Sequence, residues 1–132
     1  DQKARYGLFQ RARSNWIGII VKRPIGNAIW DRTSVVGGTE GLAGTNLERF
    51  NRAQAMLNIG QIPAESLDHI VLSLGYVLAS RDVRTAIVGT RNLDHIVANI
   101  EAVEKSSSIS ECVVTEINKR FDLVGKDWCA ID

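Results

Sequence analysis

The sequence predicts an α/β fold in which two short parallel strands stand among about five helices. Two short apolar runs, Trp16–Val21 and Thr85–Val88, are rich in β-branched residues and show no alternation. This pattern is typical of strands that are buried on both faces, as in parallel sheets. Segments with apolar residues at helical spacing lie before, between and after the two runs, and alternating strands and helices favour a parallel sheet.

Composition excludes several broad classes of protein. Of 132 residues, 45% are hydrophobic and 23% are charged, which is average for globular proteins and excludes disordered, collagen and coiled-coil chains. The net charge of +1 gives no indication of nucleic acid or of an anionic membrane as a partner. The longest apolar stretch, Trp16–Val21, is far shorter than the roughly 20 residues of a membrane-spanning helix. No nucleic-acid motif accompanies the basic residues near the start of the chain, so we interpret them as solvated helix faces.

Three helices are expected before the second strand. Residues 2–14 are predicted to form an amphipathic helix with Ala4, Leu8, Phe9 and Ala12 on its apolar face. A second helix opens at the capping box Thr45–Glu48 and carries Leu47, Phe50, Ala53, Met56 and Leu57 on one face. The strongest helical signal is an unbroken apolar stripe at positions 67, 70, 71, 74, 77 and 78.

Two further helices follow the second strand. The first carries Ile96, Ile100 and Val103 on one side. The second is capped by Ser110, presents Val113, Ile117 and Phe121 on one side and ends at Gly125, after which Trp128 is expected to cover part of the core. Cys112 and Cys129 stand 17 positions apart, with no Cys-x-x-Cys pair and no histidines at ligand spacing. They are interpreted as reduced cysteines of a cytoplasmic protein without a metal site; the alternative is a disulfide or a metal-binding role.

The chain is expected to be part of a larger domain. Two strands are too few for a stable parallel sheet that is covered on both faces. The sequence also begins at Asp1, and its single methionine is Met56. Residues 25–45 contain five glycines and little periodicity, and are predicted to form a long loop that is either functional or disordered.

The segment Val88–Asn92 is a candidate anion-binding turn. A strand ends at Gly89 and a helix starts within a few residues, so free backbone N–H groups and the helix dipole would favour a negative charge there. Thr90 adds a hydroxyl donor and Arg91 adds a positive charge. The alternative is purely local: Thr90 or Asn92 caps the helix and Gly89 only turns the chain.

The segment Lys22–Asn27 repeats this arrangement after the first strand. Lys22 and Arg23 supply two cations, and Gly26 allows a ligand to approach the backbone closely. The alternative is an ordinary basic strand end followed by a Pro24 turn. The two segments together favour a binding function, because the loops after strands 7 and 8 of a (β/α)₈ barrel commonly bind phosphate.

Two motifs carry a resemblance to a known family. Residues 17–30 (Ile-Gly-Ile-Ile-Val-Lys-Arg-Pro-Ile-Gly-Asn-Ala-Ile-Trp) resemble the seventh strand and following loop of the aldo-keto reductases. Residues 87–100 (Ile-Val-Gly-Thr-Arg-Asn-Leu-Asp-His-Ile-Val-Ala-Asn-Ile) resemble the eighth strand and the cofactor-holding helix, most of all in bacterial members with Gly-Thr after that strand. The resemblance implies that residues 1–132 are the C-terminal part of a (β/α)₈ barrel enzyme that moves hydride between NADPH and a carbonyl.

The same resemblance implies a set of cofactor-binding residues. The cofactor pyrophosphate would lie along Pro24, Ile25, Gly26 and Asn27, next to the cation of Arg23. Gly89, Thr90 and Arg91 would meet the 2′-phosphate, and Asn99 would face the adenine. His95 stands where many members have Arg, and Ala98 where many have Glu. These departures imply weaker binding of the 2′-phosphate and the adenine, so NADP is expected and NAD remains an alternative.

The family's catalytic Asp, Tyr, Lys and His come from the first half of the barrel, which residues 1–132 do not include. Tyr76 and His69 are interpreted as packing or surface groups, and Lys22 as a cofactor or solvent contact. We therefore expect a cofactor-binding segment with no catalytic residues of its own, completed by the missing half of the barrel or by self-association. The alternative is a stand-alone, non-catalytic remnant that acts as a binding or assembly module.

Overall fold

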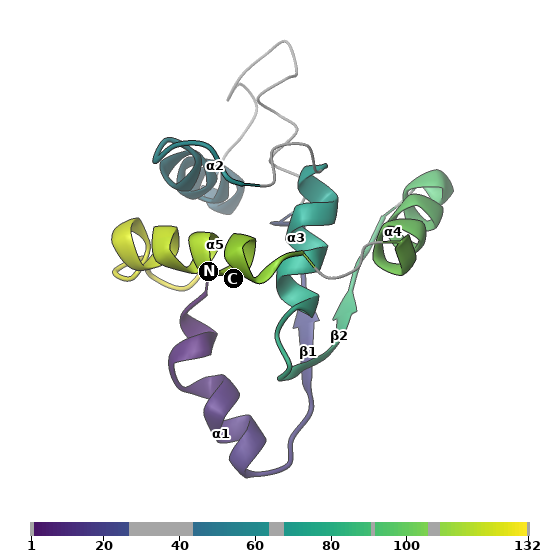
Figure 1. Ribbon diagram of the computed structural model, residues 1–132, viewed down its shortest axis with the longest axis horizontal. Helices are drawn as coiled ribbons and strands as arrows, with labels where there is room; N and C mark the ends of the chain where they lie inside the picture. The colour runs from purple at the N-terminus through teal and green to yellow at the C-terminus, as the bar shows by residue number, and fades with distance from the viewer. Residues whose placement is uncertain (1, 27–43, 64–67, 91, 106–108, 132) are drawn as a thin grey trace.

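The computed structural model describes residues 2–26, 44–63, 68–90, 92–105 and 109–131. A 3₁₀ turn at Lys3–Tyr6 precedes α1 (Leu8–Ser14) and β1 (Ile19–Lys22), and α2 (Gly44–Leu57) and α3 (His69–Leu78) lead to β2 (Val83–Ile87). The chain continues with α4 (Leu93–Lys105) and α5 (Glu111–Val124). Within these ranges the mixed α/β class is confirmed, with two short strands and five α-helices (Figure 1). Most of the predicted 25–45 loop lies outside the described residues, as does position 67 of the α3 stripe.

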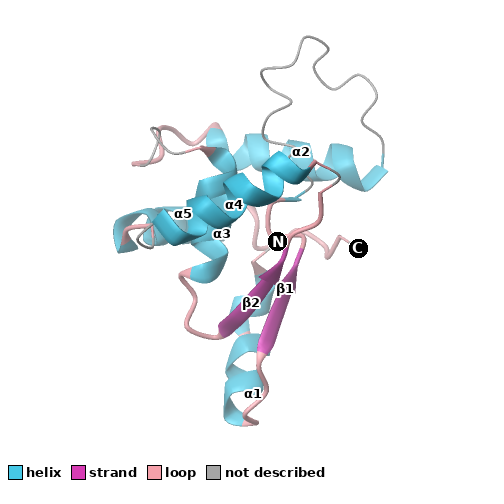
Figure 2. Ribbon diagram, turned by 90° about the vertical axis from the view of Figure 1, so that its right-hand side faces the viewer, coloured by secondary structure: helices cyan, strands magenta, loops and turns pink. Residues whose placement is uncertain are grey.

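The two strands pair in parallel, as predicted. Ile20 lies opposite Thr85 and Lys22 opposite Ile87, with a register shift between Ile19 and Ile20 where β2 carries one extra residue. Both strands run in the same direction, so the loops that leave Lys22 and Ile87 start at the same edge of the sheet. In Figure 2, α1 lies beyond the amino ends of the strands and α2 lies beyond their carboxyl ends.

Helix α3 is the crossover element that makes this pairing possible, because parallel strands need a long connection between them. The carboxylate of Asp68 caps the helix and accepts from the Ile70 N–H at 2.7 Å. Leu74 is fully buried, and α3 packs against β2 on one side and α4 on another. The sequence pattern predicted the apolar stripe of α3 but not the Asp68 cap.

The expectation that the strands are buried on both faces is wrong. Burial alternates along β1, and the side chains of Ile20 and Ile87 are 62% and 59% exposed. Trp16, just before β1, is 98% exposed. The reason is that α3 covers one face of the pair, while no other described element covers the opposite face.

The predicted helix over residues 2–14 is interrupted. The structure has a 3₁₀ turn and a separate α1, joined at Gly7. Ala12 is buried as expected, but Leu8 is exposed. The Arg13 guanidinium donates two hydrogen bonds to the Asp82 carboxylate, at 2.7 and 2.6 Å, and so ties the end of α1 to the turn before β2.

The core lies between α2, α3 and α5. Ile109, Val113 and Ile117 are buried there, with Met56 and Tyr76 packed against them. Phe121 is fully buried, with the Tyr6 ring stacked at 6.4 Å and the Trp128 ring edge-on at 5.9 Å. The predicted apolar faces of α2 and α5, and the covering role of Trp128, are therefore confirmed.

The predicted caps of these two helices differ from the structure. Helix α2 begins at Gly44, so Thr45 lies inside it, and the Thr45 hydroxyl accepts from Arg49 while Glu48 pairs with Arg52. The capping box is therefore wrong. Ser110 stands at the N-cap of α5 as predicted, but its hydroxyl contacts Cys112 Sγ at 2.9 Å and caps no backbone N–H.

Arg120 joins α5 to α2 through a buried charge whose three nitrogens all donate hydrogen bonds. Its side chain is 2% exposed, and its Nε donates to Glu116 Oε1 at 2.7 Å. The two terminal nitrogens donate to backbone carbonyl oxygens at and just beyond the end of α2, those of Met56, Gly60 and Gln61, at 3.0, 2.7 and 2.7 Å. These carbonyls have no helical partner, and the helix dipole makes this end negative, so a cation is favoured here.

Replacing Arg120 with Met should therefore lower the free energy of unfolding by about 3 kcal/mol or more, because it leaves the carbonyl oxygens of Met56, Gly60 and Gln61 without this donor and removes the partner of Glu116, and each buried unsatisfied group costs roughly 1–3 kcal/mol. Urea denaturation of the wild type and R120M measures this. Lys119→Met, on the exposed side of the same helix, is the control and should stay within about 0.5 kcal/mol. Equal stability of the two variants would contradict the role given to Arg120.

Candidate functional site

The carboxyl edge of the two strands brings the two predicted loops together. Because Lys22 pairs with Ile87, the segments Arg23–Gly26 and Val88–Thr90 begin side by side. All the predicted cofactor-binding residues are described except Asn27 and Arg91, which lie outside the described residues. The carboxyl ends of the two strands therefore place both glycine-containing loops at the same edge of the sheet.

The loop after β1 is a tight turn with two exposed cations, Lys22 and Arg23, at its start. The Gly26 N–H donates to the Arg23 carbonyl oxygen at 3.0 Å, and Arg23 and Gly26 both have left-handed φ angles, of 56° and 55°. Only glycine adopts this region without cost, so the turn favours Gly26 and strains Arg23. The side chains of Lys22 and Arg23 are exposed and bond to no other described residue.

The loop after β2 is organised by local hydrogen bonds. The Thr90 hydroxyl oxygen accepts from the Asn92 N–H at 3.1 Å, and Asn92 Oδ1 accepts from the Asp94 N–H at 2.9 Å. Asn92 thus caps α4, which is the local alternative that the sequence left open. Gly89 is exposed, and a Cβ added there would meet no atom within 4 Å, so a ligand could approach its backbone closely.

Helix α4 places the two remaining predicted residues on one face. His95 and Asn99 stand four positions apart and so lie one turn from each other. His95 is exposed and Asn99 is half-buried. The apolar side chains of α4, those of Leu93, Ile96, Val97, Ile100 and Val103, are also largely exposed.

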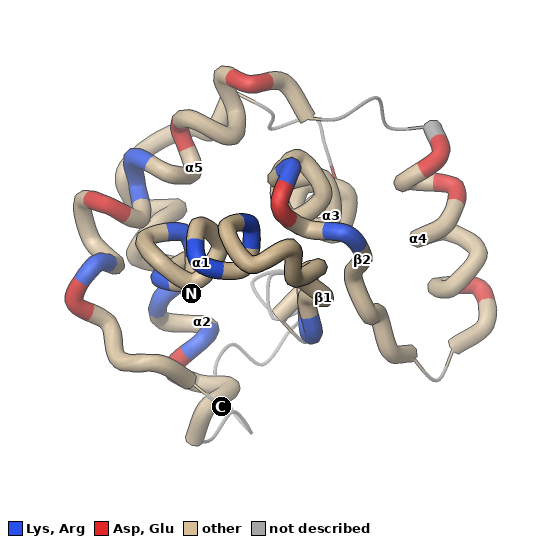
Figure 3. The backbone as a smooth tube through the Cα atoms, turned by 90° about the horizontal axis from the view of Figure 1, so that it is seen from below, with Lys and Arg blue, Asp and Glu red and all other residues tan. Residues whose placement is uncertain are grey.

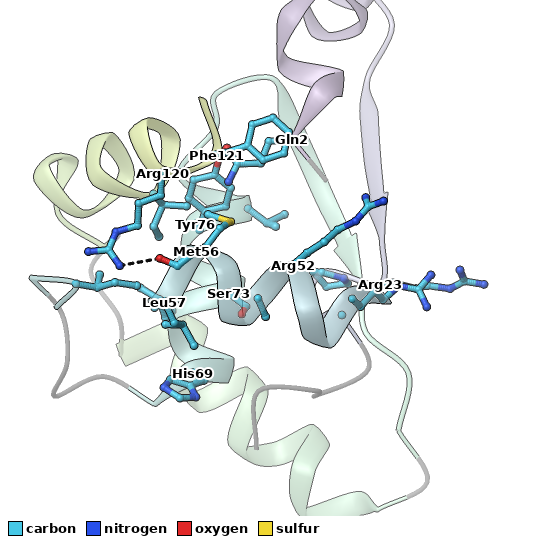
Figure 4. Close-up of a pocket in the computed structure, with 18 of the residues that line it drawn as sticks. Gln2, Arg23, Arg52, Met56, Leu57, His69, Ser73, Tyr76, Arg120 and Phe121 are labelled. Atoms are coloured by element: carbon cyan, nitrogen blue, oxygen red, sulfur yellow. Dashed lines mark hydrogen bonds between the residues drawn. The ribbon is translucent and has the colours of Figure 1, made fainter. Parts of the chain in front are cut away.

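A cavity of about 680 Å³ lies between α2, α3, α5 and the end of β1 (Figure 4). Arg23, Pro24 and Gly26 of the first loop line it, together with apolar side chains of the three helices. Ile25, Gly89, Thr90, His95 and Asn99 do not line it. The structure therefore brings the two loops to one edge, but only the first loop opens into the cavity.

Sequence reasoning missed three arginines that line this cavity. Arg49 and Arg52 come from α2, and their spacing of three positions was a usable signal for a shared helix face. The Arg52 guanidinium pairs with Glu48, lies 5.2 Å from the centre of the Trp128 ring and donates to the Cys129 carbonyl oxygen. Arg120 lies on the same face of α5 as the buried Val113 and Ile117, and this helical spacing in the sequence could have indicated that Arg120 is buried.

Tyr76 lines the cavity as a packed, neutral phenol. Its hydroxyl donates to Asn118 Oδ1 at 2.6 Å, and burial raises the pKa of Tyr76 to about 12, with a smaller opposing effect from Arg5. A phenol with this pKa stays protonated at neutral pH. His69 also lines the cavity and is exposed at the start of α3.

No protein-family model and no curated protein matches this sequence. In the described part of the chain, no helix has the length and apolar composition needed to cross a membrane. Both cysteines are free and exposed.

The raised pKa of Tyr76 predicts a loss of stability at alkaline pH. An unfolded tyrosine has a pKa of about 10, so the folded state holds this proton more tightly, and the contribution is fully present below pH 10. It should be lost as the pH rises from about 10 to 12, by up to about 3 kcal/mol. Denaturation of the wild type and Tyr76→Phe across this range measures the difference. If the free energy of unfolding changed with pH in the same way in both proteins, the folded state would not hold the Tyr76 phenol in its neutral form.

Proposed function

We propose that residues 1–132 form the cofactor-binding C-terminal portion of an NADP-dependent oxidoreductase of the aldo-keto reductase type. One observation carries the proposal: the parallel pairing of β1 and β2 sets two glycine-containing loops side by side at one edge. In barrels and open α/β sheets, ligands bind at the carboxyl ends of parallel strands. The resemblance of residues 17–30 and 87–100 to the family's seventh and eighth strands supports the same function.

The residues present fit a dinucleotide's phosphates. Gly26 and Gly89 leave open space where a side chain would stand, so a pyrophosphate has room beside the backbone. Lys22 and Arg23 supply positive charge that no described group neutralises. Thr90, His95 and Asn99 would contact the 2′-phosphate and adenine side, with Arg91 between them in sequence. The bound dinucleotide would supply the hydride.

This segment would bind and orient the cofactor but would not complete the reaction. Carbonyl reduction needs a proton donor beside the hydride acceptor. Tyr76 does not meet this need, because its hydroxyl is engaged with Asn118 and its pKa is about 12. The proposal therefore assigns proton transfer to residues of the first half of a barrel.

Unpaired surfaces support a partner that completes the barrel. Ile20 and Ile87 are exposed on the sheet face opposite α3, and neither strand has a second neighbour in the described part of the chain. Open strand edges are templates for pairing with further strands. The apolar side of α4 is exposed as well, and Figure 3 shows basic residues on α1 and acidic residues on α4 that would flank such a partner.

The alternative is a stand-alone binding or assembly module, and the core between α2, α3 and α5 favours it. That core is closed by Arg120 and Phe121 without any contribution from the strands' open face. Co-purification with a separate first-half chain and recovery of NADPH oxidation would support the barrel. A monomer with a sharp, cooperative melting transition would support the module.

In the complete enzyme, Arg91→Ala should weaken NADPH about tenfold and leave NADH almost unchanged. A guanidinium makes charge-assisted bonds to a 2′-phosphate, which NADH lacks, and one such bond is worth roughly 1.5–3 kcal/mol, of which the lower value corresponds to about tenfold. Fluorescence titration of both cofactors measures the effect. Lys119→Ala, on the distant α5, is the control. An equal loss of affinity for NADPH and NADH would show that Arg91 does not bind the 2′-phosphate.

A further inference from the structure

We propose that a groove at the amino ends of β1 and β2 binds the outer face of α4 from a second copy of this chain. Trp16 would be the central apolar contact, and Arg84 would pair with Glu104 of the second copy. The groove lies at the opposite end of the strands from the loops that would hold the cofactor. The proposal therefore goes beyond the proposed function and needs no cofactor.

The end of α1 has a tryptophan where helices favour glycine. The Ile17 N–H donates to the Ala12 carbonyl oxygen at 2.9 Å, and the Trp16 N–H donates to the Arg13 carbonyl oxygen at 3.1 Å. These two bonds form a Schellman motif, in which the residue just past the helix cap has a left-handed φ angle and is usually glycine. Trp16 holds this position with a φ angle of 57°, and its side chain is 98% exposed. The indole thus adds backbone strain and exposed apolar surface without packing in return, which is expected of a residue that contacts a partner.

Trp16 stands beside a groove of about 360 Å³ that combines apolar and basic side chains. Ile17 lines the groove and is 63% exposed. Arg13 and Asp82 also line it, but Arg13 donates two hydrogen bonds to the Asp82 carboxylate, so their charges neutralise each other. Arg84 is exposed and forms no ion pair with a described residue, which leaves the groove positively charged.

Helix α4 has an outer face of the opposite charge. Leu93, Val97 and Ile100 lie on one side of this helix and are 78%, 55% and 53% exposed. Glu104 follows Ile100 by four positions and Val97 by seven, so its exposed side chain extends the same side. Figure 3 shows the acidic residues of α4 on the side away from α3 and the strands. This outer face is therefore both apolar and acidic.

The charges of the two surfaces select a second copy as the partner. Two α4 faces would repel each other, and so would two grooves, whereas a groove and an α4 face attract each other. Contact between Trp16 and the apolar residues of α4 would remove both from water. Because every copy carries both surfaces, the groove of one copy would meet α4 of the next. A chain that completes a barrel would cover α4 instead, so the two partners would exclude each other.

Trp16→Gly separates association from folding. We expect W16G to unfold at a higher urea concentration than the wild type, because glycine takes the left-handed φ angle without strain. We also expect the Kd of self-association to rise about tenfold or more, because the central apolar contact is lost. Sedimentation velocity at micromolar to sub-millimolar concentrations measures the second effect. Leu123→Ser is the control, since it removes a 68% exposed apolar side chain from α5 and should associate like the wild type.

Charge reversal tests the pairing of Arg84 with Glu104. Arg84→Glu should weaken self-association about tenfold, because it sets two carboxylates against each other. Adding Glu104→Lys to the same chain brings opposite charges together again and should restore association. The matched control combines Arg84→Glu with Glu111→Lys, which gives the same net charge but changes an exposed residue of α5, and it should stay weak.

Three results would each overturn the proposal. One is a wild type that stays monomeric at every concentration. Another is a W16G variant that associates like the wild type or is less stable in urea, which would mean that Trp16 serves the fold. The third is equal association of the two double variants, which would show that Arg84 and Glu104 do not meet. None of these measurements involves a cofactor, so their failure would leave the proposed cofactor site unaffected.

Discussion

The parallel pairing of β1 with β2 is the constraint on which the rest of the structure depends. Parallel strands cannot be joined by a tight turn, so the chain must return through a long connection, and α3 provides its last part. The pairing of Lys22 with Ile87 then places the loops Arg23–Gly26 and Val88–Thr90 at the same edge. It also leaves a second sheet face, with Ile20 and Ile87, that the described residues do not cover.

The helices form a second unit that is held by different forces. Arg120 neutralises the negative end of α2 from within α5, and Phe121 fills the space between Tyr6 and Trp128. The Arg120 contacts fix α2 against α5, and the cavity lies between these two helices and α3. The helices meet the sheet where α3 packs against β2 and again at the end of β1, where Arg23 and Gly26 belong both to the sheet edge and to the cavity rim.

Periodicity in the sequence predicted what depends on neighbours along one helix, such as Val113, Ile117 and Phe121 of α5. The order of strands and helices along the chain also predicted that the glycine-containing loops after β1 and β2 start at the same edge, because parallel strands end on the same side of a sheet. Periodicity failed for the burial of Ile20, since burial depends on a covering element that a strand's own residues do not specify. The Arg120 contacts and the cavity join positions about 60 residues apart, and no local pattern encodes such packing.

The claim that both loops form one phosphate-binding edge is tested most directly by nuclear magnetic resonance. ¹⁵N-labelled chain is titrated with NADP⁺, and the backbone amides of Gly26 and Gly89 are followed together. The account predicts that both amides shift with the same concentration dependence, while Gly125, buried at the end of α5, stays in place. A shift at only one loop, or at neither, would contradict it.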